Sequence, residues 1–380
     1  MKIIIVGAGI SGLSCAIFLK EAGYKPTLIE KNTELRSFGA GLQLGPNAVS
    51  ILNRYGFSEE LAKLATFPKK IRFNNLKGNQ NLLEVSLEDY ENIFGAKYCY
   101  LMRADLINML YKKFLDLGID IRFDHIVESV EANSKECLLN TNLGSIKANK
   151  IIGADGINSK VRESLTKNEP IFSNKVAWRG TALLSDLDPI FFEDVGVWVS
   201  NNMHAVFYPI LEKNILNFVV ITQENDFKGY SSSYSNSFEV GELLQKFEIN
   251  QKLKNAISKS QNLFRWNIYT MPSFRWASAN VGLIGDAAHP ILPFMAQGSS
   301  LGIEDAYQVA LNFAQKDTNL ENLYRKRKLK VARVAYYSKT SGQIYHLPSS
   351  LRKLAFKFNS YFPYFLSRRL SFAYKNILND

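Results

Sequence analysis

The hydrophobic positions at the start of the chain predict a strand, a helix and a second strand. A β-branched run occupies residues 2–6, an apolar helix-like stretch continues to Gly23, and a second strand is expected over 26–30. Residues 3–19 carry no charge, as in the core of a signal peptide. Only Lys2 precedes this run, no clear small-residue cleavage site follows it, and it is shorter than the roughly 20 residues of a membrane span. We therefore expect a soluble α/β unit to begin here.

The hydrophobic pattern changes in the middle of the chain, between residues 171 and 275. Short aromatic and β-branched runs replace the helical pattern and predict a sheet. The runs lie at 195–199, 205–208, 214–222 and 264–269. With residues 66–100 they are expected to form a second layer, so that two lobes interleave along the chain. The polar stretch 229–237 is predicted to be a loop.

An apolar run at 281–284 predicts another buried parallel strand, and Gly285 and Asp286 stand where this strand ends. Ligands of parallel α/β sheets bind outside the carboxyl ends of the strands. Asp286 is therefore a candidate to accept a hydrogen bond from a sugar-like hydroxyl. The alternative is that Asp286 only caps a turn.

A helix is predicted over 301–313, after a loop in which Pro290 and Pro293 exclude regular helix. Gly298 and the two serines that follow it provide flexible backbone and candidate N-caps. The free N–H groups at the start of such a helix favour an anion. Gly298 thus marks a predicted anion-binding helix start.

Three glycines follow the first strand with the spacing of a dinucleotide-binding motif, GAGISG. Gly7 permits the tight turn, Gly9 lets the backbone approach a pyrophosphate, and Gly12 lets the helix pack closely on the strand. Glu30 ends the second strand 18 residues beyond Gly12, where an acid binds a ribose 2′-hydroxyl. Strand, glycines, helix, strand and acid in this order predict binding of an adenine dinucleotide.

A further turn follows a predicted strand in the stretch KIIGADGINSKVRESL, at 150–165. Asp155 stands just after the strand, and Arg162 lies in the helical stretch behind it. An aspartate followed by glycine is also typical of an ordinary turn. Its place between the other two motifs favours a role at the phosphates of a dinucleotide.

Together GAGISG, GADGINSKVR and GLIGDAAHPILPFMAQGSSLGIEDA resemble the three fingerprints of the class A flavoprotein monooxygenases, the para-hydroxybenzoate and salicylate hydroxylase-like family. Two other stretches match the same family, RSFGAGLQLGPN at 36–47 and LMRADL at 101–106. These five segments occur in the family's order and span nearly the whole chain. The resemblance implies non-covalently bound FAD, with NAD(P)H as co-substrate.

The resemblance also implies a role for individual side chains. Glu30 is expected to bind the adenosine ribose, Arg103 the FAD phosphate or ribityl region, and Asp286 the ribityl chain. Gln43 is expected near the isoalloxazine, whose anionic edge faces Gly298.

Three more charged residues are implied to serve the cofactors. Asp155 and Arg162 are assigned to the pyrophosphate region and to transient NAD(P)H docking, and Arg36 to NAD(P)H or FAD. For both arginines the alternative is a solvated surface position. No second GxGxxG follows, so NAD(P)H is not expected to have a Rossmann domain of its own.

The activity implied by the resemblance is hydroxylation of a small aromatic or related ring substrate. NAD(P)H reduces the FAD, O₂ forms a C4a-hydroperoxide, and its distal oxygen passes to the substrate. A related flavin oxidoreductase, such as an epoxidase or an oxidative decarboxylase, is one alternative. A halogenase is disfavoured because the WxWxIP signature is absent. A non-catalytic FAD-binding interaction protein is the other alternative.

Candidate substrate residues are Arg179, in a WRG segment similar to that of salicylate hydroxylase-like proteins, and the cavity-lining candidates Tyr208, Phe294 and Met295. A partly buried arginine attracts a carboxylate or phenolate. The alternatives are that Arg179 ties the domains together and that the others are core residues. His204 and His289 are further candidates for acid or base groups.

The predicted fold class is α/β, with a Rossmann-type FAD-binding lobe, an interleaved β-sheet substrate domain and a C-terminal helical tail. The FAD lobe is assigned to 1–65, 101–170 and 276–320, and the substrate domain to 66–100 and 171–275. The tail is 321–380. Either a monomer or a homodimer is expected.

Charge is concentrated in that tail. The chain carries a net charge of +11, and residues 321–380 contain 13 Lys or Arg but only Glu321 and Asp380 as acids. Basic, aromatic amphipathic helices bind anionic lipid, so a peripheral contact at the inner membrane surface is one hypothesis. The alternative is that the aromatic residues pack on the FAD lobe. Nucleic acid is not expected as a partner, because no recognition motif is present.

Cysteines and histidines suggest neither a disulfide framework nor a metal site. Cys15, Cys99 and Cys137 are widely spaced without a CxxC motif, which favours a reducing cytoplasm. The four histidines lack the spacing of metal ligands, so no metal is predicted.

Overall fold

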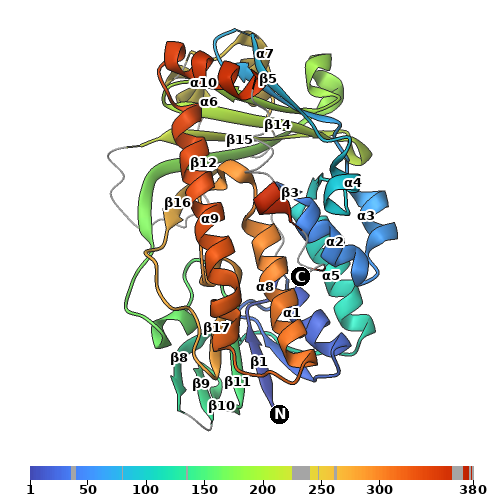
Figure 1. Ribbon diagram of the computed structural model, residues 1–380, viewed down its shortest axis with the longest axis vertical. Helices are drawn as coiled ribbons and strands as arrows, with labels where there is room; N and C mark the ends of the chain where they lie inside the picture. Colours follow the sequence, from blue (N-terminus) through green and yellow to red (C-terminus); the bar gives the residue numbers. More distant parts are fainter. Residues whose placement is uncertain are drawn as a thin grey trace.

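The computed structural model describes residues 1–35, 40–78, 80–133, 136–224, 240–246, 248–260, 263–361, 371–375 and 378. Two lobes stand one above the other in Figure 1, a parallel sheet with helices below and a large sheet above. The predicted α/β class with interleaved lobes and a C-terminal helical tail is confirmed. The loop predicted at 229–237 lies outside the described residues.

A five-stranded, all-parallel sheet forms the centre of the lower lobe. Its order is β17 (Val281–Leu283), β11 (Lys150–Gly153), β1 (Ile3–Val6), β2 (Pro26–Ile29) and β7 (Asp120–Arg122). The central strands are continuous apolar runs because both faces of the sheet are covered. Helix α1 (Ile10–Glu21) packs between α5 (Arg103–Asp116) and α8 (Gly298–Ala314). The strand, helix and strand predicted at the start of the chain are confirmed.

Two smaller sheets complete this lobe. Strands β8 (Val127–Ala132), β9 (Cys137–Thr141) and β10 (Gly144–Ala148) form an antiparallel sheet at the lower end in Figure 1. Strand β3 (Gly41–Leu44) pairs with β6 (Cys99–Met102), just before α5. This pair brings Gly41 against the upper sheet, where its N–H donates to Asn217 Oδ1 at 2.6 Å.

The upper lobe is a seven-stranded sheet built from two separate parts of the chain. Its order is β16 (Phe264–Thr270), β12 (Ile171–Leu183), β15 (Ile215–Gln223), β14 (Met203–Ile210), β13 (Val195–Val199), β4 (Lys70–Asn75) and β5 (Asn81–Ser86). All pairs are antiparallel except β13 with β4. The four strands predicted between 195 and 269 are confirmed. The longest strand, β12, was not among the predicted runs.

The remaining described helices pack on the two sheets or on neighbouring helices. They are α2 (Pro46–Arg54), α3 (Ser58–Leu64), α4 (Tyr90–Phe94), α6 (Val240–Lys246), α7 (Gln251–Ser258), α9 (Glu321–Tyr345) and α10 (Ser349–Tyr361), with short 3₁₀ turns at Val161–Ser164, Leu184–Asp186, Pro189–Phe191, Leu211–Lys213, Gly285–Ala287 and Pro293–Met295. Helix α9 runs beside α8 from the lower lobe to the upper one, where α10 lies over the sheet (Figure 1). In the described part of the chain, no helix has the length and apolar character needed to cross a membrane.

Candidate active site

A cavity of about 430 Å³ lies where the carboxyl ends of the parallel strands meet the upper sheet. Its lower wall is formed by the starts of α1, α5 and α8 and by the turns after β11 and β17. Its upper wall is formed by side chains of β4, β5 and β12 to β15. Ten of the residues proposed from the sequence as site candidates line it: Gly9, Gln43, Arg103, Arg179, His204, Tyr208, Asp286, Phe294, Met295 and Gly298.

The three glycines of GAGISG each have a different local role. Gly7 has a φ of +102°, and a Cβ there would lie 2.5 Å from the carbonyl oxygen of Ala154. A Cβ on Gly12 would lie 1.9 Å from the carbonyl oxygen of Gly7, so the helix can approach the turn only without one. Gly9 differs, because no atom lies within 4 Å of the position a Cβ would take. Gly7 and Gly12 therefore serve packing, and Gly9 leaves room on the cavity side for a ligand.

Glu30 is buried at the end of β2 and does not line the cavity. Its carboxylate accepts hydrogen bonds from the backbone N–H of Ala8, at 2.8 Å, and of Asn32, at 3.0 Å. These bonds fix the glycine turn to the neighbouring strand. The carboxylate retains lone pairs that can accept from ribose hydroxyls, so ribose binding stays a prediction.

Asp155 and Arg162 hold backbone rather than line the cavity. Asp155 Oδ2 accepts from the N–H groups of Lys160 and Val161, at 2.8 and 3.2 Å, and burial raises the pKa of Asp155. Arg162 is buried and donates to the carbonyl oxygens of Ile157, at 2.6 Å, and Ala287, at 3.3 Å. The alternative of a solvated Arg162 is therefore wrong. Arg36 lies outside the described residues, and the cofactor roles of all three remain predictions.

Asp286 is exposed to the cavity and makes no hydrogen bond or ion pair with the residues that the structure describes. Its turn is held instead by Gly285, whose φ is +60° and whose N–H donates to Asp305 Oδ2 at 3.0 Å. The carboxylate of Asp286 is thus available to a ligand, rather than being used to cap its own turn.

Helix α8 begins earlier than predicted. It starts at Gly298, Gln297 is its N-cap residue, and no side chain caps it. Ser300 is not an N-cap: it lies inside the helix, and its hydroxyl accepts from the N–H of Gly45 at 3.1 Å. The first-turn N–H groups therefore stay open toward the cavity, which Gly298 and Ser299 line.

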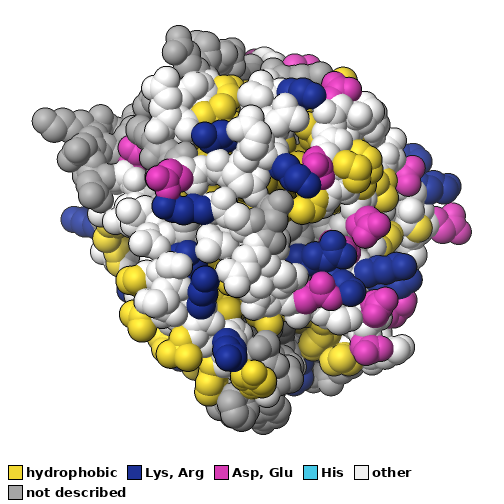
Figure 2. All heavy atoms as spheres, turned by 90° about the horizontal axis from the view of Figure 1, so that it is seen from above, with side chains coloured by type: hydrophobic (Ala, Val, Ile, Leu, Met, Phe, Trp, Pro, Cys, Tyr) yellow, Lys and Arg dark blue, Asp and Glu magenta, His cyan; other side chains and the backbone are white. Residues whose placement is uncertain are grey.

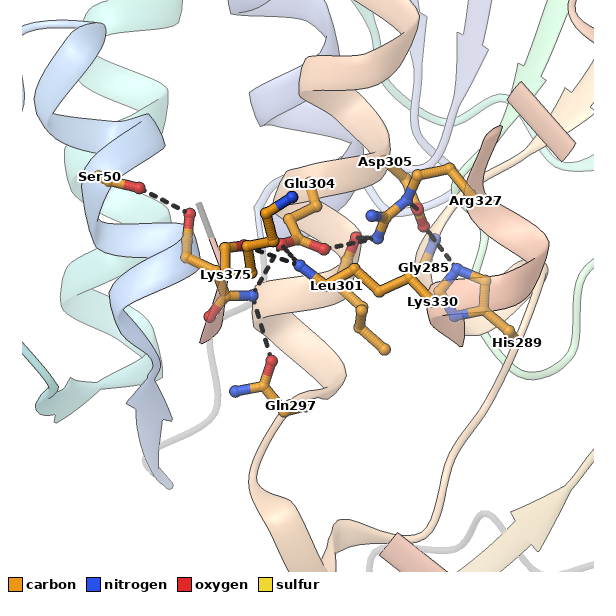
Figure 3. A network of polar contacts seen from close by, with 11 residues as sticks. Ser50, Gly285, His289, Gln297, Leu301, Glu304, Asp305, Arg327, Lys330 and Lys375 are labelled. Atoms are coloured by element: carbon orange, nitrogen blue, oxygen red, sulfur yellow. Dashed lines mark hydrogen bonds and ion pairs between the residues drawn. The ribbon is translucent and has the colours of Figure 1, made fainter. Parts of the chain in front are cut away.

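Behind this helix start lies a buried ion cluster, made of His289, Glu304, Asp305, Arg327 and Lys330 (Figure 3). Arg327 pairs with Glu304 and with Asp305, both at 2.8 Å, and Lys330 pairs with Glu304. Asp305 also lies 2.6 Å from His289 Nε2. Burial raises the pKa of Asp305, but the charges of His289 and Arg327 outweigh burial and lower it below its usual value. The cluster fixes α8 to α9 and to the turn that carries Asp286.

His289 belongs to this cluster and does not line the cavity. Its ring packs edge-on against Trp276, with centroids 5.6 Å apart. The proline-containing loop that carries His289 does not indicate the pairing with Asp305, because Asp305 lies in the next helix, α8. A structural role is therefore the one supported by its contacts.

Arg179 lies in the middle of β12 and faces the cavity without a hydrogen bond or ion pair to any described residue. Burial lowers its pKa, although Tyr208 and Asp286 act in the opposite direction. Arg179 thus makes none of the domain-tying bonds that were the alternative for it. A partly buried guanidinium without a partner among the described residues favours binding of an anion.

His204 is a cavity residue for which the sequence alone offered no geometric support. It is 1% exposed, lines the cavity from β14, and has Nδ1 3.1 Å from Nε2 of His346 at the end of α9. Burial lowers the pKa of His204 and lowers that of His346 to about 4. The two rings are therefore neutral near pH 7 and share a hydrogen bond.

The C-terminal tail also contributes to the cavity, which the sequence did not indicate. Ser341 and Tyr345 of α9 and Tyr374 form part of the lining. Tyr98 lies beside Tyr374 and donates a hydrogen bond to Gln43 Oε1. The many aromatic residues of the tail were the only signal of this role.

A family model described as FAD binding domain matches residues 1–327. The chain belongs to this FAD-binding family. A 3-amino-4-hydroxybenzoate 2-monooxygenase of Streptomyces platensis is 31% identical over 91% of the chain and 89% of its own length. A 3-hydroxybenzoate 6-hydroxylase of Klebsiella oxytoca is 28% identical over 91% of the chain and 89% of its own length. The resemblance to the class A flavoprotein monooxygenases is thereby confirmed.

Solved structures share the fold of this FAD-binding protein. Klebsiella pneumoniae HpxO, complexed with FAD and uric acid, superimposes with a TM-score of 0.86 at 20% identity, over 100% of the chain and 98% of HpxO. A salicylate hydroxylase substrate complex gives a TM-score of 0.80 at 22% identity, over 98% of both chains. FAD as the cofactor agrees with the sequence prediction.

Proposed function

We propose that the protein is an FAD-dependent monooxygenase that uses NAD(P)H and O₂ to hydroxylate a small aromatic carboxylate. The observation that carries this proposal is a single cavity with a glycine-lined nucleotide turn on one side and the unpaired Arg179 on the other. The names of relatives point the same way, because hydroxybenzoates and 6-hydroxynicotinate are aromatic rings with a carboxylate.

The lower wall of the cavity fits an FAD. Gly9 leaves space beside the turn, and Asp286 and Arg103 line the cavity without a side-chain partner among the described residues. Asp286 accepts from ribityl hydroxyls, and Arg103 donates to a phosphate or ribityl oxygen. The free N–H groups at the start of α8 favour negative charge near Gly298, and no acidic residue in the first turn of the helix already supplies it. When bound, FAD supplies electron transfer from NAD(P)H and the activation of O₂.

Arg179 orients the substrate by donating to its carboxylate. The carboxylate supplies the counter-charge that the guanidinium lacks. Without it, removing the guanidinium from water is unfavourable. Phe294 and Met295, which also line the cavity, pack against the ring and exclude water.

Two observations support His204 as the acceptor of a hydrogen bond from a ring hydroxyl. It lines the cavity, and its lowered pKa keeps the ring neutral near pH 7. A neutral imidazole has one nitrogen with a free lone pair, and the ring is held in place because Nδ1 shares a hydrogen bond with Nε2 of His346. A hydrogen bond accepted from the hydroxyl orients the aromatic ring in the cavity.

The test is to purify the protein, record its visible spectrum and add NADH or NADPH with a series of hydroxy- and amino-substituted aromatic carboxylates. We expect a flavin spectrum, faster NAD(P)H oxidation with some of the compounds, and a product heavier by one oxygen atom. A product that has lost CO₂ would assign an oxidative decarboxylase instead. Bound flavin that neither nucleotide bleaches, with or without ligand, would assign the non-catalytic alternative.

Two further parts of the proposal concern organisation. The FAD lobe comprises 1–65, 101–170 and 276–320, and the substrate domain comprises 66–100 and 171–275. The basic tail makes a peripheral contact with an anionic membrane surface. The net charge of the tail supports this contact.

A further inference from the structure

Helix α10 exposes a row of large apolar side chains. Leu351, Leu354, Phe358 and Tyr361 are 53, 65, 49 and 69% exposed. Their spacing of three, four and three residues places them on one face of the helix. We name these four side chains the outer face of α10. Figure 2 views this end of the molecule, where hydrophobic, basic and acidic side chains lie interspersed on the surface.

The opposite face of α10 is firmly packed. The ring of Phe356 lies between Phe73 and Tyr345, with centroids 5.4 and 6.4 Å away. Arg352 is buried and donates to Asn201 Oδ1 at 3.2 Å and to the carbonyl oxygen of Leu347 at 2.8 Å. The helix is thus held in place by one face while its outer face is exposed. A row of large apolar side chains exposed on one helix face is typical of an interaction site.

Charge favours a lipid surface over a second copy of the chain. Lys353 and Lys357 are exposed beside the outer face, and residues 349–361 contain no acid. A symmetric dimer through this face would bring the lysines of both copies together, which is unfavourable. An anionic membrane instead offers apolar depth for the leucine and aromatic side chains and phosphate for the lysines.

We propose that the outer face of α10 inserts into the interface of an anionic lipid bilayer and holds the substrate cavity next to it. Phe73 and Tyr345, whose rings contact Phe356, also line the cavity. One helix therefore separates the lipid from the cavity wall. This inference deepens the proposed membrane contact and rests on the proposed function only in taking this cavity as the active site.

The experiment uses the full-length flavoprotein in a flotation assay. Vesicles of equal parts phosphatidylglycerol and phosphatidylcholine are compared with vesicles of phosphatidylcholine alone. We expect binding to the anionic vesicles only. The double variant Leu354→Glu/Phe358→Glu should bind at least about 10-fold more weakly, and Lys353→Gln/Lys357→Gln about 30-fold more weakly.

The matched control is Leu143→Glu, because Leu143 is 64% exposed and lies between β9 and β10 at the other end of the molecule. It should bind vesicles as the unchanged protein does. Absence of vesicle binding by the unchanged protein overturns the inference, as does equal loss in the Leu143 control. Self-association that Leu354→Glu abolishes, without vesicle binding, assigns the face to a second copy instead. NAD(P)H oxidation in solution reports the proposed function separately, since none of these residues lines the cavity.

Discussion

Two sets of charges lie in and around the cavity, and they differ in burial and in whether they are paired. In the buried ion cluster behind α8, Arg327 has a carboxylate at 2.8 Å on each of two neighbouring residues. Arg179, in the wall of the cavity, has no such partner among the described residues. A buried charge without a partner costs stability. The comparison therefore separates charges that hold the fold from a charge that is kept for a ligand.

The largest expected effect comes from breaking the paired set. Arg327→Met leaves Glu304 and Asp305 buried without that cation, so we expect the free energy of unfolding to fall by about 3–5 kcal/mol. Urea denaturation of the purified protein measures it. The matched control is Arg325→Met, on the same helix but 66% exposed, which should leave the unfolding midpoint nearly unchanged. Equal losses in both variants would show that the cluster has no special role.

A second prediction concerns the hydrogen-bonded pair His204 and His346, which is neutral near pH 7, unlike the paired and unpaired charges. Burial, helped by Lys175 and Arg352, lowers the pKa of His346 from 6.5 to about 4. As pH falls, the unfolded chain takes up a proton at this position before the folded one does. Stability is therefore full above about pH 6.5 and declines by roughly 3 kcal/mol as the pH approaches 4.

Urea denaturation across this pH range tests the sign and the size of the effect. The variant His346→Gln should show a shallower decline. The contribution of Asp305 does not interfere, because its pKa is lowered, so its stabilising effect is lost only as pH falls below its usual value of 3.8. An unchanged decline in the variant would assign the pH dependence to other groups.

The third prediction removes the unpaired charge. Arg179→Met should raise KM for an aromatic carboxylate about 10- to 150-fold, the range for one hydrogen bond to a charged group. Unlike Arg327→Met, it should not lower the free energy of unfolding, because no described partner is left behind. Arg179→Lys, which keeps the charge but not the planar fork, should lie in between. An unchanged KM would mean that the carboxylate binds elsewhere.

The comparison also shows where sequence reasoning succeeds. The glycines of GAGISG and the acid at the end of β17 were predictable, because their roles follow from positions next to one another in a strand, turn and helix. The strands of the upper sheet were predictable from alternating β-branched and aromatic residues. Local geometry decides these features, so local sequence reports them.

Long-range pairing decides the rest. Arg327 stands in the basic run RKRKLK, where nothing separates it from its neighbours, yet it is 2% exposed and pairs with α8. His204 and His346 lie 142 residues apart and meet only because α9 ends against β14. The apolar outer face of α10 was likewise not separable from aromatic residues that pack inward, such as Phe356. Which side of a helix meets the fold is set by tertiary contacts.

The smallest expected effect is that of replacing Asp286, and we compare it with the replacement of Asp305. Asp286→Asn removes a charge that has no described partner, so the apoprotein should keep its unfolding free energy while FAD binds about 10-fold more weakly. Asp305→Asn should lower the free energy of unfolding, because this side chain pairs with Arg327 and His289 and accepts from the N–H of Gly285. Fluorescence titration with FAD and urea denaturation of both variants separate the two outcomes. If Asp286→Asn lost stability as Asp305→Asn does, the cavity acid would have to be counted with the charges that hold the fold, and pairing would no longer distinguish the two sets.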